Sequence, residues 1–285
     1  MLPDPLFLNV HMYGIMISVG ILAAFAVLHL YGKKVGLTQK LIDFIFYTGV
    51  AVIVFGFFTS ALFQSLYDYI EDPSKGFKIT GDITFIGGLI GGAALFLIIY
   101  ACYRKKLDMK LSSALPTIAC CITVGHGFGR VGCFFAGCCY GKETDFFLAV
   151  KFPKLPNPVH PTQLYEAAFL FLLFGVLSYL TLKKKYRGGF AVYLCSYAVF
   201  RFLVEFIRDD HRGELVAGIS PSQFWSIGMF LIGVIMFIVY AARKPAPETI
   251  PEKVGEIAEE IAEEIAEEIS EDIPDETPEE NSEEL

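Results

Sequence analysis

The sequence predicts an all-α integral membrane protein of seven transmembrane helices, with its N-terminus outside and its C-terminus in the cytoplasm. Hydrophobic residues make up 54% of the chain and charged residues 19%, whereas soluble domains average about 45–50% and 25%. Mean hydropathy is +0.52. The apolar residues also gather in seven separate runs of about 20 residues, which no water-soluble core accommodates. A bilayer is therefore the predicted solvent for most of the chain.

Each apolar run is close to the length that a helix needs to cross a hydrocarbon layer of about 30 Å. We expect spans at 11–31, 43–66, 83–103, 112–131, 161–182, 189–207 and 219–241. No basic segment or small-residue cleavage site precedes the first run, so a cleaved signal peptide is not expected.

Basic residues follow the odd-numbered spans and set the predicted orientation. They are Lys33, Lys34, Lys40, Arg104, Lys105, Lys106, Lys110, Lys183, Lys184, Lys185, Arg187, Arg243 and Lys244. The positive-inside rule makes that side cytoplasmic. The opposite side carries acidic residues after the second and sixth spans and a long loop at 131–160. An odd number of spans then places the two termini on opposite sides.

Charge divides the chain into a membrane domain at 1–244 and an acidic, low-complexity cytoplasmic tail at 245–285. Residues 251–285 hold 16 acidic residues and one lysine, a net charge of −15, which leaves +7 on the remaining 250 residues. A solvated tail is the simpler interpretation, and a weak interaction helix is the alternative. This pattern of an apolar body and an acidic tail excludes a nucleic-acid-binding protein.

The sixth span carries a polar stripe in a segment that should face lipid. Tyr193, Tyr197, Arg201, Glu205 and Arg208 follow one another at helical spacings of three or four residues. A charge at mid-membrane costs about 2.5–3.5 kcal/mol on insertion scales, so such residues face a cavity or a partner. Arg201 and Glu205 form either a structural ion pair or one wall of a site for an anionic headgroup, and we favour the site.

The end of the fourth span is rich in glycine and holds a second buried arginine. The glycines of the run Gly125-His126-Gly127-Phe128-Gly129-Arg130-Val131-Gly132 permit close backbone approach and irregular turns. Irregular backbone is tolerated at membrane depth only where it lines protein or water. The planar fork of Arg130 suits phosphate oxygens. His126 lies one turn earlier on the same face, either as a satisfied polar residue or as part of the chemistry.

Three cysteines follow directly, and their role stays open at this point. Cys133, Cys138 and Cys139 are expected on the outer side. They are buried small residues, partners in a disulfide, or reactive thiols activated by Arg130. A metal site with His126 as fourth ligand is disfavoured because the spacing contains no Cys-x-x-Cys pair, so we predict no metal and no cofactor.

Taken in order, several segments resemble the bacterial prolipoprotein diacylglyceryl transferase family over residues 9–241. The matching segments are Tyr13-Gly14, Gly87-Gly88-Leu89-Ile90-Gly91, Gly129-Arg130-Val131-Gly132, His160-Pro161-Thr162-Gln163-Leu164-Tyr165-Glu166 and Arg201-Phe202-Leu203-Val204-Glu205-Phe206-Ile207-Arg208. Small residues at 87–92 also have the spacing of tight helix packing. The sequence departs from the family pattern at Ile86, where a histidine is usual, and at Gly132-Cys133-Phe134 and Ala136-Gly137-Cys138, where an asparagine and a glutamate are usual.

The resemblance implies an enzyme of the cytoplasmic (inner) membrane that moves the diacylglyceryl group of phosphatidylglycerol to the lipobox cysteine of a prolipoprotein signal peptide. The reaction forms a thioether and releases glycerol phosphate. By resemblance, Arg130 holds the headgroup, Arg201 is a second essential arginine, and Tyr13 and Glu205 are catalytic. We add His126 as a replacement base. Headgroup binding is expected to involve Gly88, Gly132, Gly141, Tyr197 and Arg208. A transferase with another acceptor and a non-enzymatic lipid-binding or transport protein are the alternatives.

Overall fold

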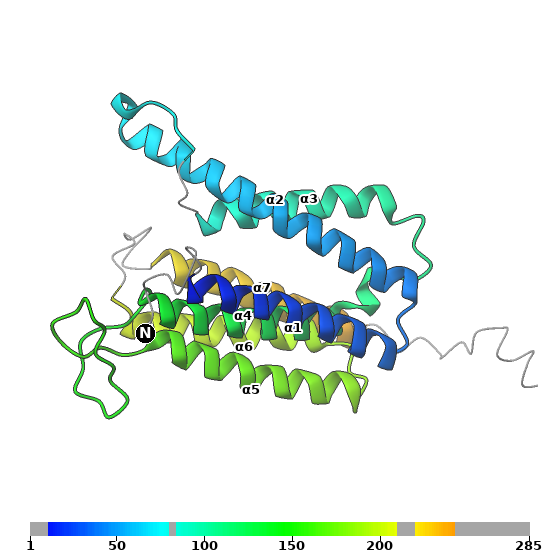
Figure 1. Cartoon of the computed structure of the whole chain (residues 1–285). Helices are drawn as coiled ribbons and strands as arrows, with labels where there is room; N and C mark the ends of the chain where they lie inside the picture. The colour runs from blue at the N-terminus through cyan, green and yellow to red at the C-terminus, as the bar shows by residue number, and fades with distance from the viewer. Residues whose placement is uncertain (1–10, 80–83, 210–219, 243–285) are drawn as a thin grey trace, which may run out of the picture. The chain divides into compact units, whose positions relative to one another are not determined.

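A computed structural model describes residues 11–79, 84–209 and 220–242, and over these ranges the chain is helical (Figure 1). Its helices are α1 (Met12–Lys34), α2 (Gln39–Glu71), α3 (Phe85–Tyr103), α4 (Leu115–Ala136), α5 (Thr162–Leu182), α6 (Gly189–Val204) and α7 (Pro221–Ala242). Single 3-10 turns occur at η1 (Pro73–Lys75), η2 (Leu111–Ser113) and η3 (Glu205–Ile207). The described ranges contain isolated β-bridges but no strand, which confirms the all-α prediction. The predicted tail, 245–285, lies outside the described residues.

Six helices within the described ranges are long and apolar enough to cross a bilayer. They are Met12–Lys34, Gln39–Ile70, Leu115–Ala136, Thr162–Leu182, Gly189–Ile207 and Pro221–Ala242. The third predicted span corresponds to a shorter apolar helix, Gly87–Tyr103. Large apolar side chains such as Leu22, Phe58 and Ile235 are exposed on these helices. Hydrocarbon is the solvent that such surfaces require, and the chain is accordingly an integral membrane protein.

Glycine determines how closely α1 and α4 approach each other. A Cβ added at Gly20 would meet the carbonyl oxygen of Gly125 at 2.9 Å and the Cβ of Phe128 at 3.1 Å. One added at Gly132 would meet Tyr13 Cδ2 at 3.2 Å. The first turn of α1 therefore lies against the last turn of α4, and the two helices run antiparallel with their backbones nearly in contact.

The glycines of α4 do not break the helix. Of the two roles that these glycines permit, irregular turns are wrong, because α4 continues without interruption to Ala136, and close backbone approach is confirmed by the contact between Gly125 and Gly20. The left-handed residue of this segment is Gly137, with φ of 70°, and it lies immediately after the end of α4. Small size, rather than conformational freedom, is what these positions provide: Gly125 accommodates Gly20 of α1, and Gly127 lies against the ring of Phe171 of α5.

The two glycine pairs of α3, at 87–88 and 91–92, pack tightly against α2, as their spacing predicts. Gly87 lies against Phe63 and Thr59 of α2, and Gly91 lies directly on the Thr59 side chain. A second link joins the two helices where Ser60 donates a hydrogen bond to the backbone carbonyl of Thr84. Figure 1 shows α2 and α3 side by side over most of the length of α3.

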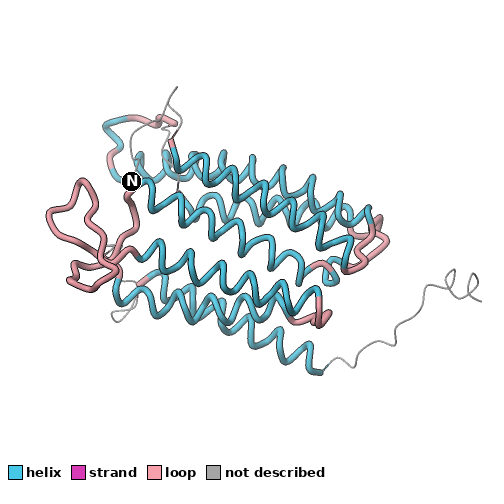
Figure 2. The backbone as a smooth tube through the Cα atoms, turned by 60° about the horizontal axis from the view of Figure 1, so that its bottom comes forward, coloured by secondary structure: helices cyan, strands magenta, loops and turns pink. Residues whose placement is uncertain are grey.

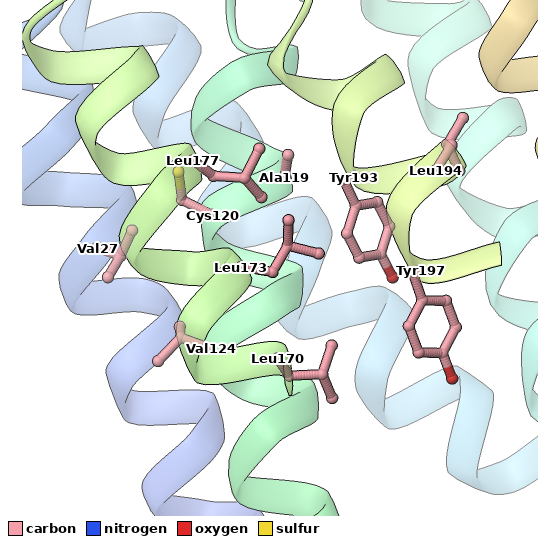
Figure 3. Close-up of a cluster of buried hydrophobic side chains, with 10 residues drawn as sticks. All are labelled: Val27, Ala119, Cys120, Val124, Leu170, Leu173, Leu177, Tyr193, Leu194 and Tyr197. Atoms are coloured by element: carbon pink, nitrogen blue, oxygen red, sulfur yellow. The ribbon is translucent and has the colours of Figure 1, made fainter. Parts of the chain in front are cut away.

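A core of buried side chains joins α1, α4, α5 and α6 (Figure 3). Leu170, Leu173 and Leu177 point inward from α5 at one-turn intervals. Tyr193 and Tyr197 face them from α6, with ring centroids 6.0 Å apart and planes only 7° from parallel. Because these tyrosines carry hydroxyl groups into an otherwise apolar core, they mark where the interior becomes polar.

The ends of the bundle differ in charge and in loop length. Lys33 and Lys34 end α1, and Lys183, Lys184 and Lys185 follow α5 at the same end as the α1–α2 connection. The opposite end holds the starts of α1 and α5, the end of α4, and the long α4–α5 connection at 137–161, which Figure 2 shows as an extended loop. The candidate site lies at this second end.

Candidate active site

Three side chains from two helices meet at a single carboxylate oxygen near the end of α4. Glu166 Oε1 lies 3.0 Å from Arg130 Nε and 3.6 Å from His126 Nε2. Arg130 Nε is also within hydrogen-bonding distance of His126 Nε2, at 3.3 Å. His126 and Arg130 share one face of α4, as their spacing predicts, while Glu166 reaches them from the first turns of α5. The arginine charge is thereby compensated inside the bundle.

A tyrosine from α6 completes this arrangement. Tyr197 of α6 donates a 2.7 Å hydrogen bond to the same oxygen, Glu166 Oε1. Its ring also meets the His126 ring edge-on, with centroids 5.1 Å apart. Glu166 itself is fully buried, and its second oxygen, Oε2, has no hydrogen-bond partner among the described residues. A carboxylate this deep is costly unless it is paired, so its counter-charge on Arg130 is structurally required.

Arg130 keeps part of its hydrogen-bonding capacity for a ligand. The described contacts use Nε, and the side chain is 18% exposed although its partner is buried. A guanidinium group offers five N–H donors in a fixed fork. The two terminal nitrogens carry donors that these contacts do not use, and a phosphate is the anion that best matches their geometry.

A second ionic cluster forms around Glu205, where α6 passes into η3. Arg201 Nη1 lies 2.8 Å from Glu205 Oε2, and Arg208 Nε lies 3.8 Å from the same oxygen. Ser222 of α7 accepts a 2.8 Å hydrogen bond from Arg201 Nη2, and Ser220 donates one of 2.9 Å to Glu205 Oε1. The predicted i, i+4 pairing of Arg201 with Glu205 is therefore formed, and it is buried.

The two clusters belong to one electrostatic environment. Arg201 lies one turn beyond Tyr197 on α6 and interacts electrostatically with Glu166 and His126. Arg130 acts on the same carboxylate. Arg130 forms an ion pair with Glu166, while Arg201 is paired with Glu205 and acts on Glu166 only through its electrostatic field. Fixed positive charge of this kind, in a region of low dielectric constant, acts strongly on an anion.

Tyr13 and the thiols lie on the α1 side of this region. The Tyr13 ring contacts Gly132, and its hydroxyl group interacts electrostatically with Arg130 and with all three cysteines that end α4 and begin the following loop. The sulfur atoms of Cys133, Cys138 and Cys139 lie within 4.8 Å of one another. These cysteines are free thiols, so the structure contains no disulfide among them.

The first turn of α5 holds the thiol-bearing segment in place. Thr162 donates a 2.8 Å hydrogen bond to the backbone carbonyl of Cys139, and Gln163 donates one to that of Cys138. Gly141 continues the segment and pairs through its amide with the His160 carbonyl, at 2.8 Å. A side chain at Gly141 would collide with the Ile207 carbonyl and with Thr162. The motif at 160–166 therefore both delivers Glu166 and fixes the loop.

Hydrogen bonding among the thiols gives Cys138 and Cys139 different pKa values. The Cys133 and Cys138 side chains hydrogen-bond to the Cys139 sulfur and, together with Arg208 and Arg130, hold the pKa of Cys139 below that of an ordinary thiol. Hydrogen bonds with Cys133 and Cys139, followed by burial, raise the pKa of Cys138. Cys139 is thus the thiol of this group that ionises first, and the thiolate is the reactive form of cysteine.

Comparison with known proteins places this arrangement in a family. A family profile described as prolipoprotein diacylglyceryl transferase matches residues 5–239, which include every described side chain of the site. The chain belongs to this family. Similar proteins include phosphatidylglycerol–prolipoprotein diacylglyceryl transferases of Clostridium tetani, 37% identical over 83% of this chain and 96% of that protein, and of Bordetella avium, 36% identical over 83% and 92%. One from Teredinibacter turnerae is 33% identical over 84% and 85%.

Most of the site residues predicted from the sequence of this prolipoprotein diacylglyceryl transferase family member lie in or beside the two clusters. The structure brings His126, Arg130 and Tyr197 to the buried acid. Tyr13 interacts electrostatically with Arg130, and Arg201, Glu205 and Arg208 form the second cluster. Gly132 and Gly141 provide close approach for α1 and for η3. Gly88 lies elsewhere, against Gly56 and Ser60 of α2. A role for Gly88 in headgroup binding stays a prediction.

Sequence reasoning underestimated two residues. Glu166 is the hub of the first cluster, although its position near a helix start also suits a simple capping role. Ser222 orients Arg201 from α7. A carboxylate inside an apolar run is the signal that identifies Glu166, because it needs a buried cation as partner. No comparable signal marks Ser222, since serine is common in membrane helices.

Proposed function

We propose that this chain transfers the diacylglyceryl group of phosphatidylglycerol to the lipobox cysteine of prolipoproteins, at the outer face of the cytoplasmic membrane, and releases glycerol phosphate. The names of the similar proteins give the substrate classes. The single observation that carries the proposal is the buried link from Arg130 through Glu166 to Tyr197 of α6, the helix that presents the paired Arg201 one turn further on. Phosphatidylglycerol presents a phosphodiester at membrane depth, and paired guanidinium groups match it.

The two ends of the bundle support an orientation in the membrane. In a protein of seven spans, with α3 as the third, the positive-inside rule favours a cytoplasmic position for the lysine-rich end. The starts of α1 and α5 and the ends of α4 and α6 then lie at the outer face. Since these four helix ends carry Tyr13, Glu166, Arg130 and Arg208, the site opens where a lipid of the outer leaflet and an exported signal peptide both arrive.

The chemistry is a displacement at the glycerol carbon that carries the phosphate. The acceptor sulfur forms a C–S bond to this carbon as the C–O bond to phosphate breaks, and glycerol phosphate leaves with the electron pair. The thiol proton passes to His126 Nε2 and then to solvent or the departing phosphate. Arg130 and Arg201 stabilise the charge that develops on the leaving group, which is the role of preorganised donors in a region of low dielectric constant.

An open apolar groove of about 450 Å³ lies between α5, α6 and α7, lined by Phe169, Val199, Phe200, Leu203 and Phe230 among others. Arg201 is buried on another face of α6, since residues two positions apart on a helix do not share a face. The groove is therefore a surface for lipid acyl chains beside the bundle and is separate from the arginines.

The decisive experiment is rescue of a bacterial strain that lacks its own diacylglyceryl transferase. We expect growth and lipid-modified prolipoprotein with this chain and neither with its Arg130→Ala variant. Purified protein with radiolabelled phosphatidylglycerol should release glycerol phosphate only when a lipobox peptide is added. Release with another acceptor, but not with this peptide, would support a transferase of different specificity. Lipid binding without any release would support a non-enzymatic protein.

A further inference from the structure

The three thiols at the end of α4 form a compact cluster that the proposed transfer reaction does not use. Cys133 lies in the last turn of α4, and Cys138 and Cys139 follow the left-handed turn at Gly137. The turn brings the chain back on itself: the Cys138 amide donates a 3.2 Å hydrogen bond to the Cys133 carbonyl. Their sulfur atoms consequently come within 4.8 Å of one another.

The cluster is held in a conformation that a short polar loop would not adopt by itself. Cys139 has a positive φ of 65°, which is unfavourable for a residue with a Cβ. Hydrogen bonds from Thr162 and Gln163 to the carbonyls of Cys139 and Cys138 maintain it. Both donors belong to α5 and are buried. The rest of the fold thus imposes the geometry of the three sulfurs, as a preorganised binding site requires.

We propose that Cys133, Cys138 and Cys139 bind one thiophilic metal ion, of the class of Cu(I), through three thiolate sulfurs. A metal–sulfur bond of about 2.3 Å places the sulfurs of a trigonal site about 4 Å apart. The observed spacing, within 4.8 Å, needs only a small contraction to reach this value. Thiolates are soft ligands that select Cu(I), zinc and iron–sulfur centres over harder ions.

The number of ligands favours Cu(I) over zinc. The group of candidate ligands found among the described residues consists of these three sulfurs alone. Structural zinc sites are four-coordinate and tetrahedral, whereas Cu(I) accepts three thiolates. The local charge is also suitable: three thiolates and one monovalent cation carry −2, and Arg208 and Arg130 both interact electrostatically with Cys139. The partly exposed cluster leaves a path for the ion.

Cu(I) binding to the reduced, full-length protein in detergent tests this proposal. Under anaerobic conditions, Cu(I) is presented in complex with a coloured chelator, and we expect the protein to remove one equivalent and to develop ultraviolet thiolate-to-copper absorption. Each of Cys133→Ser, Cys138→Ser and Cys139→Ser should weaken binding at least tenfold. Cys102→Ser and Cys195→Ser, which alter cysteines outside the cluster, are matched controls and should bind as the parent does.

A second measurement needs no variant and therefore does not depend on folding of the mutants. Alkylation of the parent protein followed by mass spectrometry should show that Cu(I) protects the three clustered cysteines and leaves Cys102 reactive. Failure of the reduced protein to take Cu(I) from the chelator overturns the proposal, as does unchanged uptake by the triple serine variant. Preferential binding of Zn(II), or a disulfide within the cluster that resists reduction, also overturns it.

Discussion

The Arg130 guanidinium and the Glu166 carboxylate meet at 3.0 Å, although the two residues lie on different helices and are 36 positions apart. The carboxylate is fully buried and the arginine is partly exposed. This asymmetry supports the proposed roles, in which Glu166 anchors Arg130 and the remaining donors of Arg130 meet the phospholipid headgroup. Glu166 is a positioning residue for the proposed reaction.

Glu166→Gln should preserve shape while leaving the Arg130 charge without its counter-charge. Breaking a buried pair costs about 3–5 kcal/mol because an uncompensated charge remains. We expect at least a tenfold loss of kcat/KM for phosphatidylglycerol and a lower melting temperature. Tyr197→Phe is the matched control, since it removes one hydrogen bond, worth about 1 kcal/mol, from the same oxygen. Equal kinetics in the two variants would contradict the anchoring role.

Arg130→Lys should show that the planar fork matters and not only the charge. A lysine ammonium acts as a point charge and cannot contact Glu166 while presenting two parallel donors to a phosphate. We expect KM for phosphatidylglycerol to rise at least tenfold, measured in mixed micelles of varied lipid content. Arg187→Lys, an exposed position at the opposite end of the bundle, provides the control and should leave KM unchanged.

His126→Ala tests the proposed base. With Arg130 intact, we expect transfer to be abolished while binding of phosphatidylglycerol persists, measured by lipid co-purification. His29→Ala, an exposed histidine on α1, should have no effect on either quantity. Full activity of the His126 variant would remove the histidine from the mechanism and leave the thiol proton to another group.

The thiols should differ in the pH dependence of their alkylation. Since the pKa of Cys139 is lowered, its thiolate persists as the pH falls, and iodoacetamide should label it at about pH 6, where an ordinary thiol with a pKa of about 8.5 reacts slowly. The raised pKa of Cys138 keeps that thiol protonated, so its labelling should begin only in alkaline solution. Peptide mass spectrometry measures both rates, and labelling of the two cysteines in the reverse order would refute the assignment.

Gly20→Val should destabilise the contact between α1 and α4. The added side chain meets the Gly125 carbonyl oxygen at 2.9 Å, and overpacking typically costs about 1–3 kcal/mol. Gly175→Val is the matched control in α5, because nothing lies within 4 Å of a Cβ added there. Thermal unfolding in detergent should show a lower midpoint for the first variant only.

Local spacing predicted those parts of the site that lie on one helix. His126 with Arg130 and Arg201 with Glu205 are i, i+4 pairs, and both pairs contact as expected. The convergence of Arg130, Tyr197 and Glu166 depends on how three helices pack, which periodicity does not specify. The straight course of α4 was missed for a related reason: glycine permits both irregular backbone and close helix approach, and only the neighbouring helix decides between them.

The thiol cluster illustrates the same limit of spacing rules. Cys133 and Cys138 do not form a recognised ligand pair, so the sequence argued against a metal. Gly137 and Cys139 both have a positive φ, and this turn brings the sulfurs together. A positive φ is uncommon for cysteine, and no sequence pattern indicates it. Spacing rules describe ligands on regular elements, whereas here a turn sets the geometry.

The hydrogen bonds that Thr162, Gln163 and His160 make to residues 138–141 have a consequence for evolution and for engineering. They fasten both ends of the α4–α5 connection to each other, and between them Phe152 is buried against Phe134 and Tyr140. Insertions should therefore be tolerated only at the exposed turn at 153–154, and an epitope tag placed there should report which side of the membrane it faces without disturbing turnover.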